Sequence, residues 1–114
     1  EVDYNKGIIS IQNGNYGDAV TQLGSDASFN KGLAQLLNGS ASITAGTVDG
    51  SDDAETGQGY YLKAVAAARQ DKLADVVSNL KSAISKDGAY KAKAAKDREF
   101  IKYMENASFT AIAK

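Results

Sequence analysis

A short motif near the start of the chain occurs a second time further along, and this internal repeat restricts the fold more than any other feature. Residues 4–8 read YNKGI and residues 29–33 read FNKGL, and an Asn-Gly pair follows each copy at the same distance, at 13–14 and 38–39. A third, weaker copy, YLKAV, occupies residues 61–65. Intervals of about 20–50 residues are typical of stacked repeat architectures. We therefore expect a stack of similar units.

The apolar residues within these units recur at helical spacing. In the first copy they lie at positions 4, 8 and 11, and the following Asn-Gly pair favours a left-handed helix end over a β-hairpin. The clearest apolar stripe comprises Leu73, Val76, Val77, Leu80, Ala83 and Ile84. The pattern predicts an all-α domain spanning 1–114, a stack of about three antiparallel helical hairpins at about 2–24, 28–48 and 54–86. C-terminal capping helices are expected at about 89–113.

The boundaries between these elements follow from glycines and capping residues. Gly7 and Gly32 are expected to permit close helix packing, because a helical glycine persists where a neighbouring backbone approaches. The segment 47–59 is expected to be a loop whose carboxylates lack the spacing of a calcium loop. Asp52 and Glu55 instead suit a helix start and its capping partner. A helix is then expected from 89 to 105, and Asn106 is expected to cap a last short helix.

Composition excludes several classes of function. The chain has no Cys and no His, which removes thiolate nucleophiles, disulfides, imidazole bases and the usual zinc and haem ligands. A net charge of -1 offers no electrostatic footprint for nucleic acid, and the cations of the C-terminal stretch are interrupted by acids as on an ordinary exposed helix face. No motif assembles an acid–base pair, a P-loop or a dinucleotide site. We expect no enzyme, no cofactor, no metal site and no nucleic-acid partner.

The repeat motifs resemble those of the tetratricopeptide-repeat (TPR) family. The resemblance rests on YNKG at 4–7 followed by GNYGDAV at 14–20, which is similar to the family's aromatic-Asn-Leu-Gly motif and Gly-Asp-Tyr turn. Residues 61–84 match the pattern less closely, with Asp71 in place of the turn glycine. The chain as a whole also resembles the C-terminal TPR-like region of larger repeat proteins of Bacteroidetes-type bacteria. Lys at positions 6, 31 and 63, the short first interval and the absence of Pro depart from the family pattern.

The resemblance implies a protein-interaction or assembly scaffold with a groove lined by the first helix of each hairpin. The groove residues that it implies are Tyr4, Asn5, Ile8, Gln12, Phe29, Asn30, Leu33, Tyr61, Val65 and Arg69. The expected partner is a protein or peptide. An apolar groove receives a partner helix or is filled by the chain's own C-terminal helix, and we expect Phe100, Ile101, Tyr103, Met104 and Phe109 to shield the stack internally.

Alternatives remain open on the sequence alone. The chain is also consistent with a glycan- or small-ligand-binding helical domain of an exported bacterial envelope protein, whose platforms would be its six tyrosines because it has no Trp. The three repeat-position lysines are expected to extend along the surface, with a ligand-binding ladder as the other interpretation. Because the chain begins at Glu1 without Met, it is expected to be part of a larger protein. An exported or envelope-associated location is weakly favoured.

Overall fold

The computed structural model describes residues 29–113, together with the side chains of residues 30–113. Within that range the chain forms seven helices and no strand, so the all-α prediction is confirmed for the described residues. Two compact units divide the chain, Glu1–Ala54 (unit 1) and Glu55–Lys114 (unit 2). The first predicted hairpin, at about 2–24, lies outside the described residues. The assignment of 1–114 to one domain stays a prediction.

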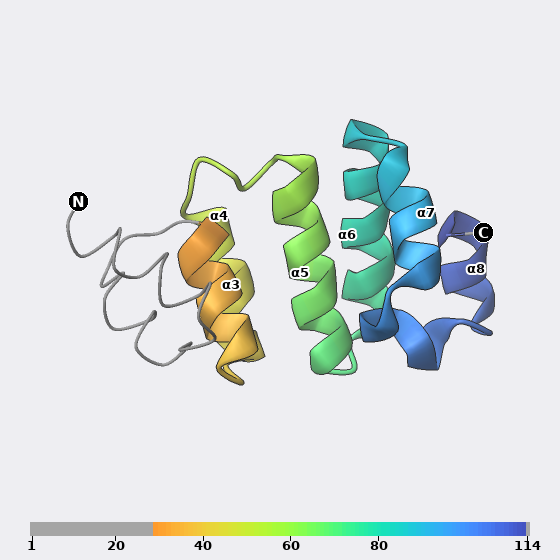
Figure 1. Cartoon of the computed structure of the whole chain (residues 1–114), viewed down its shortest axis with the longest axis horizontal. Coiled ribbons are helices and arrows are strands. Elements are labelled where there is room, and N and C mark those ends of the chain that lie inside the picture. Colours follow the sequence, from red (N-terminus) through yellow and green to blue (C-terminus); the bar gives the residue numbers. More distant parts are fainter. Residues whose placement is uncertain (1–28, 114) are drawn as a thin grey trace. The chain divides into compact units, whose positions relative to one another are not determined.

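The described part of unit 1 is a helical hairpin of α3 (Phe29–Leu37) and α4 (Ala41–Asp49), which pack against each other (Figure 1). Gly32 of α3 is buried, and the hydroxyl of Thr44 on α4 donates to its carbonyl oxygen at 3.2 Å. Such a contact requires the second helix to come close to the backbone of the first, which a glycine permits. The prediction that Gly32 supports close packing is confirmed, whereas Gly7 lies outside the described residues.

Unit 2 contains a second hairpin and three shorter helices. The hairpin consists of α5 (Gly57–Arg69) and α6 (Leu73–Lys86), and it is followed by α7 (Ala89–Lys96), η1 (Arg98–Tyr103, a 3₁₀-helix) and α8 (Ala107–Ala113). Helices α7 and α8 pack against α6 and against each other, while η1 packs against α5 (Figure 1). The C-terminal helices therefore cover both members of the hairpin.

The two hairpins turn in the same way. Gly39, between α3 and α4, has a φ of 90°, and Asp71, between α5 and α6, has a φ of 60°. In each turn the next residue donates its N–H to the carbonyl five positions earlier: Ser40 to Gln35 at 2.8 Å, and Lys72 to Ala67 at 3.0 Å. A left-handed residue followed by this long hydrogen bond is the Schellman motif that ends a helix. Gly39 and Asp71 are as far apart in the sequence as the starts of the second and third motif copies, at 29 and 61, and we call this spacing the repeat interval.

Burial recurs at the same repeat interval. Two side chains on α3 illustrate the match: Ala34 and Leu36 are buried, as are their counterparts Ala66 and Ala68 on α5. The second helices agree as well, since the buried pairs there are Thr44 with Val76 and Val48 with Leu80. The stripe predicted on α6 is confirmed, with three members buried and three half-buried. Each position that is buried in α3–α4 therefore has a buried counterpart in α5–α6 at the repeat interval, without a gap.

The loop predicted at 47–59 is shorter than expected, and both of its predicted bounds are wrong. Helix α4 continues to Asp49, and α5 begins at Gly57, so the loop is residues 50–56. Asp52 and Glu55 precede the helix start, because Thr56 is the N-cap and its hydroxyl accepts the N–H of Gly59 at 3.0 Å.

The predicted helix from 89 to 105 is also interrupted. It ends at Lys96, because Asp97 adopts an extended backbone and caps a new 3₁₀-helix by accepting the N–H of Glu99 at 3.0 Å. The Asn106 prediction is confirmed: its Oδ1 accepts the N–H groups of Ser108 and Phe109 at the start of α8.

Candidate functional site

The structure describes part of the predicted groove. Tyr4, Asn5, Ile8 and Gln12 lie outside the described residues, and for Phe29 only the backbone is described. Asn30 and Leu33 lie on α3 and are half-buried. The other three, Tyr61, Val65 and Arg69, lie on α5 at successive four-residue steps, which places them along one side of the helix. Tyr61 and Val65 are buried, at 6% and 7% exposed.

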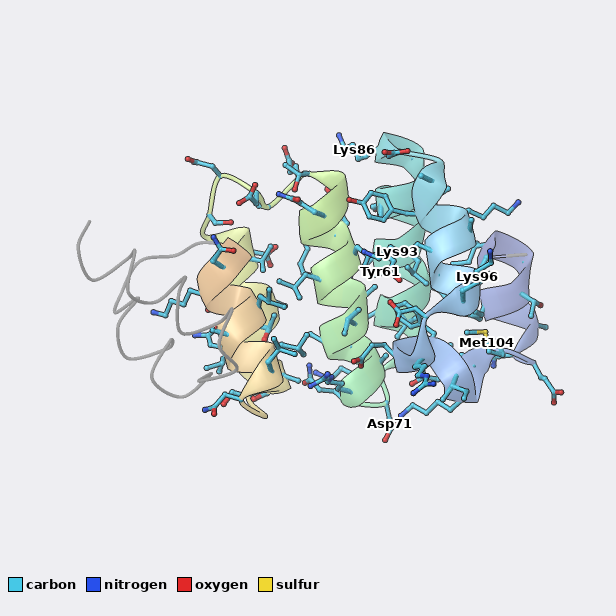
Figure 2. All side chains as sticks on the ribbon, viewed as in Figure 1. Tyr61, Asp71, Lys86, Lys93, Lys96 and Met104 are labelled. Carbon is cyan, nitrogen blue, oxygen red and sulfur yellow. The ribbon has the colours of Figure 1, made fainter. Side chains whose placement is uncertain are left out.

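Two of the α5 members, Tyr61 and Arg69, contact the chain's own C-terminal residues. The Tyr61 hydroxyl donates to Oδ2 of Asp97 at 2.6 Å, and Oδ1 of the same carboxylate caps η1. One carboxylate thus joins the middle of unit 2's first helix to the start of its 3₁₀-helix. Lys93 places its ammonium 4.6 Å from the centre of the Tyr61 ring, a cation–π distance, and Figure 2 labels both residues.

Aromatic rings extend this contact into the core of unit 2. Tyr61 stacks on Tyr90 of α7 with ring centres 5.3 Å apart and meets Phe100 of η1 edge-on at 5.7 Å. Phe100 in turn lies 5.6 Å from Phe109 of α8, which also neighbours Tyr103. Ring pairs in these orientations each add about 0.5–1.5 kcal/mol beyond the area that they bury.

Charged pairs secure the far end of α5. Arg69 binds Glu99 of η1 through both Nε, at 2.9 Å, and Nη2, at 2.7 Å, which is a bidentate contact. Just beyond the helix, Asp71 pairs with Lys102 of η1. We call this set of contacts the C-terminal closure, formed by Tyr61, Arg69, Asp71, Tyr90, Asp97, Glu99, Phe100, Lys102 and Phe109.

The environment of Tyr61 determines its chemistry. Burial raises the pKa of its phenol far above the ordinary value, and the hydrogen bond and negative charge of Asp97 raise it further. The phenol therefore stays neutral as a hydrogen-bond donor and is a poor nucleophile or base. The Glu99 carboxylate raises the pKa of Arg69, so that guanidinium also stays charged and engaged. The closure is thus a structural arrangement in which polar groups satisfy one another.

The prediction of a buried C-terminal aromatic cluster is confirmed for Phe100, Tyr103 and Phe109, while Met104 is half-buried. It is wrong for Ile101, whose side chain is 70% exposed. In a 3₁₀-helix residues three apart lie on the same side. Phe100 and Tyr103 therefore point inward together, and Ile101 is turned away. The prediction assumes an α-helix, in which Phe100, Ile101 and Tyr103 lie on one face.

Sequence reasoning misses the polar half of the closure. On the sequence alone, Asp97 and Glu99 are two of several charges on an expected exposed helix face. The available signal is the spacing of Asp97 and Glu99, an N-cap residue followed by an acid within one turn. Gly57 is missed as well: a Cβ there would come within 2.6 Å of Cε2 of Tyr90.

The described residues give little support to other kinds of site. Among them, no group of three or more carboxylate, Cys or His side chains is placed to hold a metal ion. No helix in the same part of the chain has the length and apolar character needed to cross a membrane. Of the tyrosines considered as sugar platforms, Tyr61 and Tyr103 are buried and Tyr60 and Tyr90 are half-buried. The remaining two lie outside the described residues.

Comparison of the chain with protein-family models, with curated proteins and with solved structures finds no match.

Proposed function

We propose that the chain is a non-enzymatic protein-interaction or assembly scaffold built from TPR-like hairpin repeats. The observation that carries this proposal is the equivalence of the two described hairpins, which share one turn geometry and one burial pattern at the repeat interval. Repeats of this size bury their faces against neighbours, and the resulting extended surfaces hold other molecules.

We further propose that unit 2 is the closing end of the scaffold. A terminal repeat has to shield an apolar face that an internal repeat buries against the next one. Helices α7 and α8 cover α6, and η1 covers α5 through the C-terminal closure. Tyr61 and Arg69 are then structural residues. Of the groove positions with described side chains, we assign the partner to those on α3, where Leu33 is the apolar one.

The chemistry of the polar groups supports a role in binding over catalysis. Tyr61 has a raised pKa, which is opposite to the shift that would activate it, and both the Asp97 and Glu99 carboxylates hold α5 against η1. The glycan-binding alternative has no observation in its favour, since none of the four described tyrosines is exposed. Sugar platforms need an exposed ring face.

Site-specific photo-cross-linking in the cell from which the chain comes tests the proposal. A photoreactive amino acid at Leu33, on α3, is compared with the same group at Lys81, an exposed position on α6. We expect position 33 to cross-link one discrete set of proteins, in competition with excess unmodified chain, and position 81 not to do so. Identical products from both positions, or none from position 33, would contradict the proposed groove.

A further inference from the structure

Charge is unevenly divided between the two units. Residues 1–54 contain two Lys or Arg and seven Asp or Glu, a net charge of -5. Residues 55–114 contain eleven Lys or Arg and seven Asp or Glu, a net charge of +4. The overall charge of -1 conceals this division. Opposite charge on two parts of one chain provides electrostatic complementarity between copies.

The positive charge of unit 2 is concentrated in residues 86–98, which we call the basic segment. Its cations are all exposed: Lys86, Lys91, Lys93, Lys96 and Arg98. Its two acids are already engaged within the fold, Asp87 at the N–H of Ala89 and Asp97 in the C-terminal closure. Lys93 lies over aromatic rings, and within the described part of the chain the other four cations have no ion-pair partner. The segment therefore presents uncompensated charge to solvent.

The negative counterpart is residues 49–55, which we call the acidic segment. It contains four carboxylates and no cation, in the sequence DGSDDAE. Asp52 and Glu55 are exposed. The segment begins at the last residue of α4 and ends before Thr56, the N-cap of α5.

An exposed isoleucine accompanies each charged segment. Ile101 is 70% exposed and follows Arg98 by three residues in η1, so the two share one side of the 3₁₀-helix. Ile43 is 50% exposed and lies on α4, the helix that leads into the acidic segment. These are the exposed large apolar side chains among the described residues. Each charged segment thus shares a helix with one exposed isoleucine.

We infer that the chain binds a second copy of itself head to tail, with the basic segment and Ile101 of one copy against the acidic segment and Ile43 of the next. This inference names a partner for the proposed scaffold and rests on that function. A second copy is favoured over nucleic acid, because a polyanion attracted to unit 2 is repelled by unit 1. A head-to-tail contact leaves one segment of each kind unoccupied, so further copies add to the ends.

Sedimentation velocity on the full chain tests the inference, using a pair of charge reversals. The first variant carries Lys91→Glu and Lys96→Glu, and the second carries Asp52→Lys and Glu55→Lys. We expect the wild type to associate with rising concentration and to lose at least about tenfold in affinity as salt shortens the Debye length from about 30 Å to about 3 Å. Each variant alone stays monomeric, because one of its two segments is disabled.

Mixing the two variants provides the decisive measurement. The first variant retains its acidic segment and the second retains its basic segment, so an equimolar mixture is expected to associate although each variant alone stays monomeric. The matched control is Lys72→Glu with Lys81→Glu, which changes net charge equally at exposed positions outside the basic segment. It is expected to leave self-association within about twofold of wild type. Circular dichroism checks folding, and neutral Gln and Asn replacements substitute for any reversal that lowers helix content.

Four results would overturn the inference: a monomeric wild type at low salt, a mixture no more associated than its components, an equal loss in the control, or association that nuclease treatment abolishes. None of these depends on cross-linking at Leu33. Failure of self-association with retained cross-linking would leave the proposed scaffold standing without this partner. Self-association without cross-linking at Leu33 would identify the second copy as a partner that does not use the α3 groove.

Discussion

The hairpins α3–α4 and α5–α6 have the same backbone plan and different surroundings. Both turn through a left-handed residue with the same long hydrogen bond, and each position that is buried in α3–α4 is also buried in α5–α6. Helix α5 is in addition tied to residues that follow its own hairpin, through the side chains of Tyr61 and Arg69. The repeat thus determines the backbone, whereas the residues that follow the last repeat determine what its first helix is available to contact.

The largest expected effect comes from removing the centre of the C-terminal closure. Phe100 is fully buried between Tyr61 and Phe109, so Phe100→Ala is expected to lower the free energy of unfolding by about 3–5 kcal/mol. Hydrogen exchange should show the loss in α5, η1 and α8 and leave α3–α4 protected. Ile101→Ala, one position along and exposed, is the control, with an expected change below about 0.5 kcal/mol. Equal loss of protection in both hairpins would show that the C-terminal closure does not stabilise α5–α6 in particular.

Tyr61→Phe removes the hydrogen bond to Asp97 and keeps the ring. Bonds to charged acceptors are worth about 1.5–3 kcal/mol, and we expect a loss of that size in urea unfolding at neutral pH. The raised pKa adds a pH signature. The unfolded chain releases the phenol proton first, so this contribution is complete below about pH 10 and declines above it by up to about 1.4 kcal/mol per pH unit. If the difference in unfolding free energy between the wild type and Tyr61→Phe stayed constant from neutral pH into this range, the hydrogen bond to Asp97 would not be its source.

Glycine-to-alanine changes should have opposite signs in the two hairpins. At Gly57 the new Cβ meets the Tyr90 ring at 2.6 Å, and we expect Gly57→Ala to cost about 1–2 kcal/mol after the gain in helix propensity. At Gly46 on α4, apart from the local helix backbone, no atom of the described residues lies within 4 Å of the added Cβ, so Gly46→Ala is expected to stabilise by about 0.5–1 kcal/mol. Thermal unfolding of the two variants measures both signs. A stabilising Gly57→Ala would mean that the Tyr90 ring moves away from the added Cβ at little cost in free energy.

The smallest effect tests whether the turns are equivalent. Asp71 adopts the left-handed conformation that Gly39 adopts in the other hairpin, and open space surrounds Gly39. We expect Gly39→Asp to cost about 1 kcal/mol or less and Gly39→Val to cost more, because a β-branched residue tolerates positive φ poorly. Urea midpoints of the two variants decide the order. If Gly39→Asp lowered stability as much as Gly39→Val, the two turns would differ in which residues they accept at the left-handed position.

Much of the helical plan is predictable from sequence, because it depends on local signals. The stripe on α6, the turn glycine at Gly39, the close approach at Gly32 and the cap at Asn106 each follow from a few neighbouring residues. The repeat interval is visible in the sequence, although the exact correspondence of buried positions is not. In that correspondence the counterpart of Val76 is Thr44. Its hydroxyl is tolerated in a buried position because it donates a hydrogen bond to the Gly32 carbonyl oxygen.

The candidate site is less predictable, because it joins residues far apart in the chain. The bonds from Tyr61 to Asp97 and from Arg69 to Glu99 span 36 and 30 residues. Apart from the capping spacing of Asp97 and Glu99, neither carboxylate differs locally from a solvated surface acid. The 3₁₀ geometry of η1 is also hidden, since an α-helical period places Ile101 beside Phe100 and Tyr103, whereas the tighter helix turns Ile101 outward. Two of the three predicted groove residues on α5, Tyr61 and Arg69, are therefore ones that the chain's own end engages.

The gapless match between the hairpins has a consequence for how such a chain changes length in evolution. Residues 29–60 span one repeat interval, which we call a cassette: a hairpin, its connecting segment and the first residues of α5. The next cassette begins in register at residue 61. Duplication of that stretch of gene adds one whole hairpin and returns the chain to the same phase. The closure joins Tyr61, Arg69 and Asp71 of the last cassette to residues encoded after its hairpin, so a tail of this kind terminates an array whose last cassette carries those partners.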